Sequence, residues 1–179
     1  MAIAPFDIFL KLDGIDGEST VTGHQNETVV LSYEQAIDHP APPLGGASSG
    51  AAAGRSTFSG VRFRKPLDKG SIPILLACAG GTRIQTARFA FRRTGTNLDF
   101  YKVSLDDVLV THIAQRAGDG AQYPLSFDTL TAGVDTTGFL DEVTLSCAKI
   151  QWEYQPVSAS GAPGALVKGG WDLAANRKI

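Results

Sequence analysis

Alternating apolar and polar residues, together with runs of β-branched residues, predict about eight β-strands in this chain. The clearest example is the segment 6–12, whose even-numbered positions are all apolar, whereas Asp7, Phe9 and Lys11 lie on the opposite face. The predicted strands are Phe6–Leu12, Thr28–Tyr33, Ser56–Lys65, Ile84–Thr94, Leu98–Leu105, Val108–Arg116, Asp141–Gln155 and Ala165–Leu173.

Two of these segments have further features. Residues 84–94 and 98–105 flank a Gly-Thr-Asn turn, which predicts a β-hairpin. Along 141–155 the apolar positions change phase between Cys147 and Ile150, which predicts a β-bulge there.

One helix is predicted between residues 71 and 80. Ser71 is a suitable N-cap, Pro73 falls in the first turn, where a missing N–H costs little, and Gly80–Gly81 ends the helix. Its body is apolar nearly all round, so we expect a short, largely buried helix.

Two long segments, His39–Gly54 and about 118–140, show neither a strand nor a helix period. Loops of this length in a compact domain are usually functional or disordered. About eight strands and one helix predict a single, mainly β domain over residues 1–179, folded as an antiparallel barrel or sandwich.

The composition argues against several classes of protein. Sixteen Lys and Arg against eighteen Asp and Glu give a formal net charge of −2, whereas nucleic-acid-binding domains are usually strongly basic. No stretch approaches the ~20 apolar residues of a transmembrane helix, and the N-terminus lacks the basic region of a signal peptide. We therefore expect no nucleic-acid binding and no membrane insertion.

Motifs for catalysis or metal binding are weak. Ser48 lies in a G-x-S-x-G match, but the nucleophile elbow needs a strand before it and a helix after it, and prolines precede it here. No two histidines form a paired ligand motif, so we expect all three, His24, His39 and His112, at the surface or in turns. Cys78 and Cys147 are too few for a disulfide framework, and we expect both to be reduced, buried and unreactive.

The acidic residues give no catalytic or calcium site either. Asp13, Asp16 and Glu18 follow a 1, 4, 6 spacing, whereas calcium loops use positions 1, 3 and 5, so polar turn residues are expected. Asp106 and Asp107 would point to opposite faces of an extended segment, so they form no catalytic pair.

Four arginines fall on alternating faces of two predicted strands: Arg62, Arg64, Arg88 and Arg92. They either form solvated faces or make a basic wall that meets a partner. On their own, these patterns indicate a soluble β-rich domain with two long loops and no evident active site.

Several strings carry a resemblance to a known family. FDIFLKLDGIDGES near the start, SYEQAIDHP after the second predicted strand, VLV at 108–110, AKIQWEYQP and the ending GWDLAANRKI resemble the Hcp family of bacterial type VI secretion systems. The resemblance runs from Ile3 to Ile179, and its specific parts are LDGI-x-GES and GWDL-x-x-N-[KR]. The chain departs from the family in the 39–54 loop and in 118–140.

The resemblance implies a phage tail-tube-like fold, an antiparallel two-sheet β-barrel with one short flanking α-helix. It implies a homohexameric ring that stacks into a tube, with sheath, spike, baseplate and effector proteins as partners. It also implies assembly in the bacterial cytoplasm, secretion without a cleavable signal peptide, and no catalytic residue, metal or cofactor.

The resemblance also suggests roles for particular residues. An extended loop at this place makes ring-stacking contacts in the family, which here would involve Pro40, Pro42, Pro43, Leu44, Gly45 and Gly46. The four arginines would include lumen-facing or subunit-facing residues, and the C-terminal family motif comprises Gly170, Trp171, Asp172, Leu173 and Asn176. The alternatives are a monomeric ligand- or glycan-binding β-module and a serine hydrolase that uses Ser48.

Overall fold

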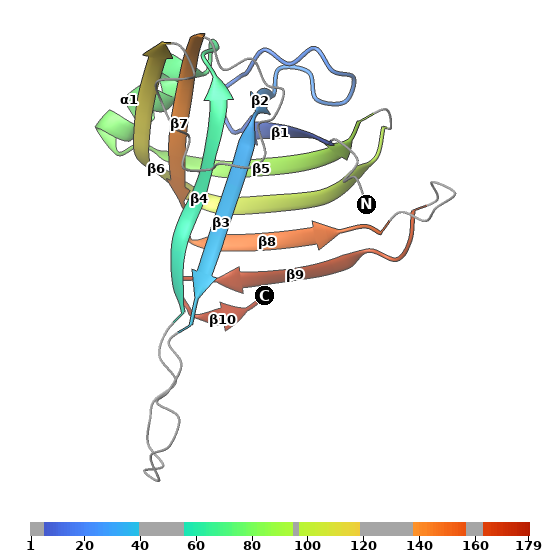
Figure 1. Cartoon of the computed structure of the whole chain (residues 1–179). Helices are drawn as coiled ribbons and strands as arrows, with labels where there is room; N and C mark the ends of the chain where they lie inside the picture. The colour runs from blue at the N-terminus through green and yellow to red at the C-terminus, as the bar shows by residue number, and fades with distance from the viewer. Residues whose placement is uncertain (1–5, 40–55, 95–96, 119–137, 157–162) are drawn as a thin grey trace.

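The computed structural model describes residues 6–39, 56–94, 97–118, 138–156 and 163–179. Ten strands and one helix occur within these ranges, and every strand pair is antiparallel (Figure 1). The elements are β1 (Phe6–Leu12), β2 (Thr28–Val30), β3 (Ser32–Asp38), β4 (Thr57–Pro66), α1 (Ser71–Gly80), β5 (Arg83–Arg93), β6 (Asp99–Gly118), β7 (Gly138–Ser146), β8 (Lys149–Tyr154), β9 (Val167–Asp172) and β10 (Arg177–Lys178).

The strands form two layers that share the long strand β6. The first layer has the order β10-β9-β8-β6-β5-β1-β2, and the second layer runs from β3 through β4 and β7 to the C-terminal half of β6. Figure 1 shows β3, β4 and β7 crossing over the strands of the first layer. The expected two-sheet antiparallel fold is thus confirmed, but strand pairing within the described residues does not close the sheets into a complete barrel.

The core lies between the two layers. Residues directly opposite in antiparallel strands point to the same face, and the inward row across β1, β5, β6 and β8 consists of Leu10, Phe89, Val103 and Trp152. Phe63 of β4 packs edge-on against Phe89, with 5.5 Å between the ring centres. Each fully buried side chain of this size stabilises the fold by about 1.5–3 kcal/mol.

Long-range pairing divides two of the predicted strands and joins two others. The segment 28–33 splits at Leu31, because β2 pairs with β1 whereas β3 pairs with β4. Predicted strands 98–105 and 108–116 are instead one strand, β6, in which Asp107 has a φ of 54°. The last predicted strand is shorter than expected, and β10 was missed.

The predicted bulge between Cys147 and Ile150 is instead a break between two strands. Ser146 at the end of β7 pairs with Leu109, whereas Lys149 at the start of β8 pairs with Asp106. The phase change in the sequence therefore marks the point where the chain passes from the second layer to the first.

Helix α1 differs from its prediction at its start and on its surface. Gly81 ends the helix in the left-handed conformation as expected, but Gly70 is the N-cap residue, and Ser71 makes no capping bond. The expected burial is also wrong, because Ile72 is 59% exposed and Leu76 is 66% exposed. Among the described residues, no helix has the length and apolarity that crossing a membrane requires.

The two predicted loops are only partly described. Residues 40–54 lie outside the described residues, as do 119–137. The second loop is nevertheless shorter than expected, because β6 continues to Gly118 and β7 begins at Gly138.

Candidate interaction surfaces

The string LDGI-x-GES forms the corner where β1 ends. Gly14 has a φ of +75°, and the amide of Ile15 donates to the carbonyl of Leu12, which folds the chain back. A side chain at Gly17 would overlap the backbone of Glu27 and Thr28, so only glycine fits there. The residues of this string are thus required by a tight turn.

One carboxylate of this corner binds the chain near α1. Glu18 accepts a hydrogen bond from the amide of Lys69 at 3.0 Å. No group of three His, Cys, Asp or Glu side chains in the described part of the chain is arranged to hold a metal ion. Glu18 thus makes the kind of backbone contact that a polar turn residue makes.

The string GWDL-x-x-N forms the turn between β9 and β10. Asp172 is buried and accepts a hydrogen bond from the amide of Ala175 at 2.8 Å, and Asn176 takes a left-handed φ of 51°. Trp171 pairs with Lys178 across the resulting hairpin. A side chain at Gly170 would crowd Ile179, so the motif residues are those that this hairpin requires.

His24 lies in a turn, which is one of its two expected positions, but it is buried in an ionic cluster and not at the surface. Its ring stacks on Phe9 with 4.3 Å between the ring centres. Its Nδ1 lies 2.6 Å from Oε2 of Glu27, and its Nε2 lies 3.1 Å from Oδ1 of Asp99. Arg92 donates to the same Asp99 oxygen at 3.1 Å and to the carbonyl of Thr22 at 2.8 Å.

These partners also set the ionisation of Asp99. Burial raises the pKa of the Asp99 carboxyl. The hydrogen bonds from His24 and Arg92 lower it by more than burial raises it, so the pKa of Asp99 lies below its usual value. Through these bonds, His24 and Thr22 in the turn before β2 contact Asp99 and Arg92 of the β5–β6 hairpin.

The other three arginines have different environments. Arg64 is buried and forms an ion pair with Glu142 at 3.1 Å. Arg62 is exposed on the outer face of the second layer and forms an ion pair with Glu34 at 4.0 Å. Arg88 is exposed on the outer face of the first layer, opposite Lys11.

A second buried cluster joins β4, β7 and α1. The Lys65 ammonium donates to Ser71 Oγ at 2.7 Å and lies 3.0 Å from Asp141 Oδ2, and all three side chains are fully buried. A neighbouring lysine and serine recur in some hydrolases, but these groups have no access to solvent and therefore to substrate. The alternating strand pattern gives no sign of this cluster, since Lys65 and Asp141 become neighbours only when β4 pairs with β7.

The remaining candidates for chemistry do not come together. Ser48 lies outside the described residues, His39 bonds Ser56 at 3.0 Å, and His112 is exposed. Asp107 forms an exposed ion pair with Arg83, separate from Asp106. No catalytic constellation is formed by the part of the chain that the structure describes.

The two cysteines are both free but differ in burial. Cys147 is buried as expected, and burial first and the charge of Asp106 second raise the pKa of its thiol to about 12. Cys78 is only partly buried, which corrects the expectation of full burial.

The apolar inner face of the first layer extends beyond its cover. One inward row runs from β1 to β9 through Ile8, Phe91, Tyr101, Tyr154 and Val167. Exposure rises along this row, from 6% at Ile8 to 47% at Tyr154 and 60% at Val167. The first layer therefore ends in an apolar surface that the second layer does not cover.

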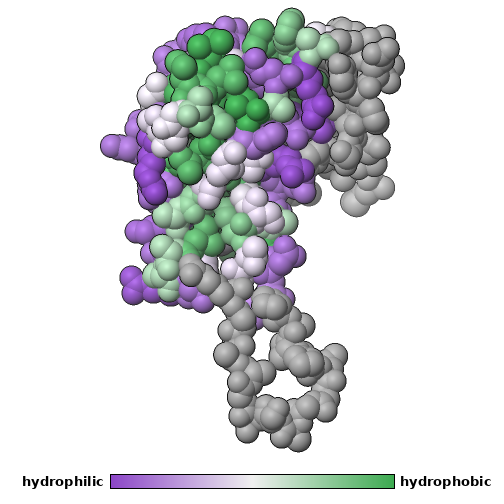
Figure 2. Space-filling view, turned by 90° about the vertical axis from the view of Figure 1, so that its left-hand side faces the viewer, coloured by the Kyte–Doolittle hydropathy of each residue, from purple (hydrophilic) through white to green (hydrophobic). Residues whose placement is uncertain are grey.

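Strand edges and helix α1 add further contact surfaces. Within the part of the chain that the structure describes, β3 is an unpaired edge of the second layer, and β10 and β2 are the edges of the first. Figure 2 shows hydrophobic side chains gathered in the upper half of the face on which α1 lies. Unpaired edges and exposed apolar side chains are features of surfaces that bind other chains.

Comparison with known proteins identifies relatives over nearly the whole chain. Residues 9–154 match the family model described as "Type VI secretion system effector, Hcp". The chain is 29% identical over 173 residues to "Protein hcp1" of Pseudomonas aeruginosa, which covers 95% of this chain and 96% of that protein.

Solved structures show the same fold. "Hcp1 from Salmonella typhimurium" superposes with a TM-score of 0.73 at 27% identity, and covers 97% of this chain and 99% of that one. A structure described as "a type six secretion system protein" superposes with a TM-score of 0.81 at 23% identity, and covers 98% of this chain and all of the other.

Proposed function

Because the chain belongs to the Hcp family of secreted type VI secretion tube proteins, we propose that it is the repeating subunit of such a tube. Six copies form a ring, and rings stack into the tube that a contracting sheath drives into a target cell together with its spike. The family match over residues 9–154 is the observation that carries this proposal. The chain would leave the cytoplasm through the machine itself, without a cleavable signal peptide, and would perform no catalysis.

Two kinds of surface support the ring. A cyclic ring requires two different, complementary patches on each copy. We assign these two patches to the edge of β3 and to the edge formed by β9 and β10, which lie on different layers. The apolar pair Tyr154 and Val167 lies beside the second edge, where a neighbouring copy would cover it.

The outer face of the first layer supports a role in holding cargo. Its alternate positions are polar across β1, β5, β6 and β8, in a row that consists of Lys11, Arg88, Ser104 and Gln151. Arg64 and Arg92 are themselves buried and paired within the subunit, so we assign the lumen-facing or subunit-facing role to Arg88 and Arg62. A polar lumen would let effectors pass without tight apolar binding.

The segment 40–54 is assigned to contacts between stacked rings. Its prolines fix φ and so reduce the entropy that is lost on docking, and Leu44 follows them as the apolar contact. The end of β3 and the start of β4, between which this segment falls in the sequence, lie at the end of the molecule opposite to α1 (Figure 1). Head-to-tail stacking would bring it to the next ring.

Electron microscopy of the negatively stained, purified protein tests the proposal directly. Six-membered rings with a central hole are expected, alone or in stacks. Uniform particles of the size of one 18.9 kDa chain would contradict the proposal and favour a monomeric ligand- or glycan-binding β-module. Labelling of Ser48 by a serine-reactive probe would instead support the hydrolase alternative.

A further inference from the structure

Beside α1 the first layer has a notch, one strand wide. Strand β1 ends at Leu12, which pairs with Ala87 of β5. Strand β5 already begins at Arg83, so its first residues extend past the end of β1. The last contact between them is the amide of Asp13, which donates to the carbonyl of Thr86 at 3.0 Å. Arg83 and Ile84 pair with β6 on one side, but residues 83–85 meet no strand among the described residues on the other.

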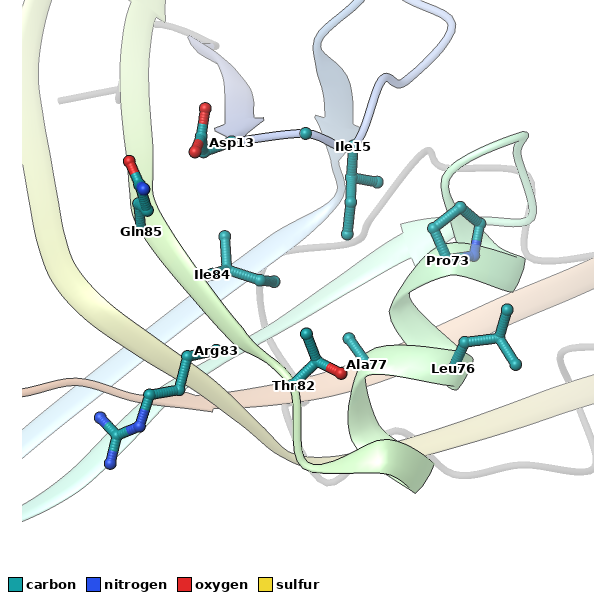
Figure 3. A pocket seen from close by; sticks show the side chains of 10 residues that line it. Asp13, Ile15, Pro73, Leu76, Ala77, Thr82, Arg83, Ile84 and Gln85 are labelled. Atoms are coloured by element: carbon teal, nitrogen blue, oxygen red, sulfur yellow. The ribbon is translucent and has the colours of Figure 1, made fainter.

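The notch is an open surface pocket with an apolar wall. It has a volume of about 410 Å³, and Asp13, Ile15, Pro73, Leu76 and Ile84 are among its lining residues. Helix α1 forms the wall opposite β5, and Leu76 on that wall is mostly exposed. Figure 3 shows the cavity between the start of β5 and α1, directly beyond the turn that contains Asp13 and Ile15.

The two sides of the notch differ in character. Figure 3 shows Ile84 directed toward α1, whereas Asp13 and Gln85 point away from the helix. An added strand would alternate in the same way, since successive side chains point to opposite faces. Every second side chain would meet the apolar wall, and the others would lie beside Asp13.

The charge at this rim is negative. Asp13, which lines the notch, is exposed and has no ion-pair partner within the described ranges. The nearby cation Arg83 is already paired with Asp107. A segment that carries Lys or Arg at its alternate positions complements this rim, and an acidic one does not.

We infer that the α1 notch binds an extended segment of another protein, in which apolar and basic residues alternate. The segment adds a short strand to the free edge at residues 83–85, places its apolar side chains against Leu76 and Ile84, and places a basic side chain beside Asp13. All the lining residues come from one chain, and the inference concerns a separate bound segment rather than ring formation.

Two synthetic peptides test the inference. One alternates leucine with lysine over nine residues, and the other has glutamate in place of each lysine. Fluorescence anisotropy should show binding of the basic peptide to the full-length protein and at least about threefold weaker binding of the acidic one, because each rim charge pair contributes modestly. Leu76→Glu should abolish binding of the basic peptide, and Asp13→Lys should reverse the preference between the peptides.

Val21→Glu is the matched control, since Val21 is an exposed apolar residue that does not line the notch. It should leave both affinities unchanged. Thermal unfolding of each variant establishes that the protein is folded, and Leu76 is exposed enough for the charge to be tolerated. Absence of binding by either peptide, equal binding of both, or binding that survives Leu76→Glu would overturn the inference. The inference would also be overturned if neither peptide bound and Leu76→Glu changed the molar mass of the protein, because a second copy of the chain would then occupy the notch.

Discussion

The ammonium group of Lys65 lies 3.0 Å from the carboxylate of Asp141, and both side chains are completely buried. Lys65 also donates to the carbonyl of Pro66 and to Ser71, and Gln115 donates to the second oxygen of Asp141. Lys65 also lies 2.8 Å from the carboxylate of Asp68, so strands β4, β6 and β7 and the chain at the start of α1 meet around the Lys65 ammonium. Removing one partner from a buried ion pair strongly destabilises a protein, because the other charge stays buried without compensation. The intact pair nevertheless adds little net stability compared with an apolar pair of similar size.

Replacing only one member of this pair should therefore be costly. Lys65→Met leaves the Asp141 carboxylate buried without its cation, and should lower the free energy of unfolding by about 3–5 kcal/mol, measured by urea denaturation. The double variant Lys65→Met with Asp141→Leu should recover part of that loss. Arg83→Met is the control, because it breaks an exposed pair worth at most about 1 kcal/mol. Equal losses for Lys65→Met and Arg83→Met would contradict the structural role of the cluster.

The cluster around Asp99 should give the protein an acid-sensitive contribution to stability. The pKa of Asp99 is lowered in the folded state, so its contribution is present above the unfolded pKa near 3.8 and is lost as the pH falls through the lower folded value. Asp99→Asn should therefore destabilise the protein at pH 7, and the difference from the wild type should shrink below about pH 4, in urea unfolding at each pH.

Asp107→Asn serves as the control for this prediction, since Asp107 forms only an exposed pair. It should show a small effect at both pH values. A deficit of Asp99→Asn that is equally large at pH 7 and at pH 3 would mean that the Asp99 charge is not the source of the stabilisation.

The two thiols should differ in reactivity. The Cys147 thiol is buried with its pKa raised to about 12, so it carries almost no thiolate at pH 8, whereas Cys78 is partly accessible. A thiol reagent at pH 8 should label Cys78 first, and the variant Cys78→Ser should react only after denaturation. Rapid labelling of native Cys78→Ser would contradict this assignment.

The raised pKa of Cys147 also predicts a loss of stability at high pH. Above about pH 9 the unfolded chain releases the thiol proton while the folded protein retains it, so the stabilisation falls as the pH rises toward 12. Cys147→Ala should flatten this part of the curve of unfolding free energy against pH. An unchanged slope between pH 9 and 11 would show that Cys147 is not responsible.

The segment 40–54 should be needed for stacking but not for folding. Replacing it with a short Gly/Ser link should leave rings intact, with a thermal midpoint close to that of the wild type, and should prevent tubes and secretion. Electron microscopy and a secretion assay measure these outcomes. Tubes that persist without the segment would remove its proposed role, and a subunit that no longer folds would make it part of the core.

The sequence predicts local structure well where the conformation depends only on residues close together in the chain. Strand β1 has the predicted bounds, and Gly81 ends α1 in the left-handed conformation, because alternation and glycine act within a few residues. The Hcp strings also predict the family, and their residues are explained by two tight turns, at Gly17 and at Asn176.

The sequence does not predict what depends on pairing across long distances. Phe9 was placed on the polar face of its strand, yet it is buried because His24 stacks on it from a turn 15 residues later. Lys65 lies at the end of an alternating strand, and its burial depends on Asp141, which is 76 residues away. Nor does apolar composition alone reveal that Ile72 and Leu76 remain exposed, since that depends on which face of α1 meets β6.

The molar mass of the protein in solution tests the central claim most directly. Light scattering after size exclusion, at tens of micromolar protein, should give six times the 18.9 kDa mass of the chain. A stable species of 18.9 kDa at that concentration would contradict the assignment of the chain as the subunit of a ring.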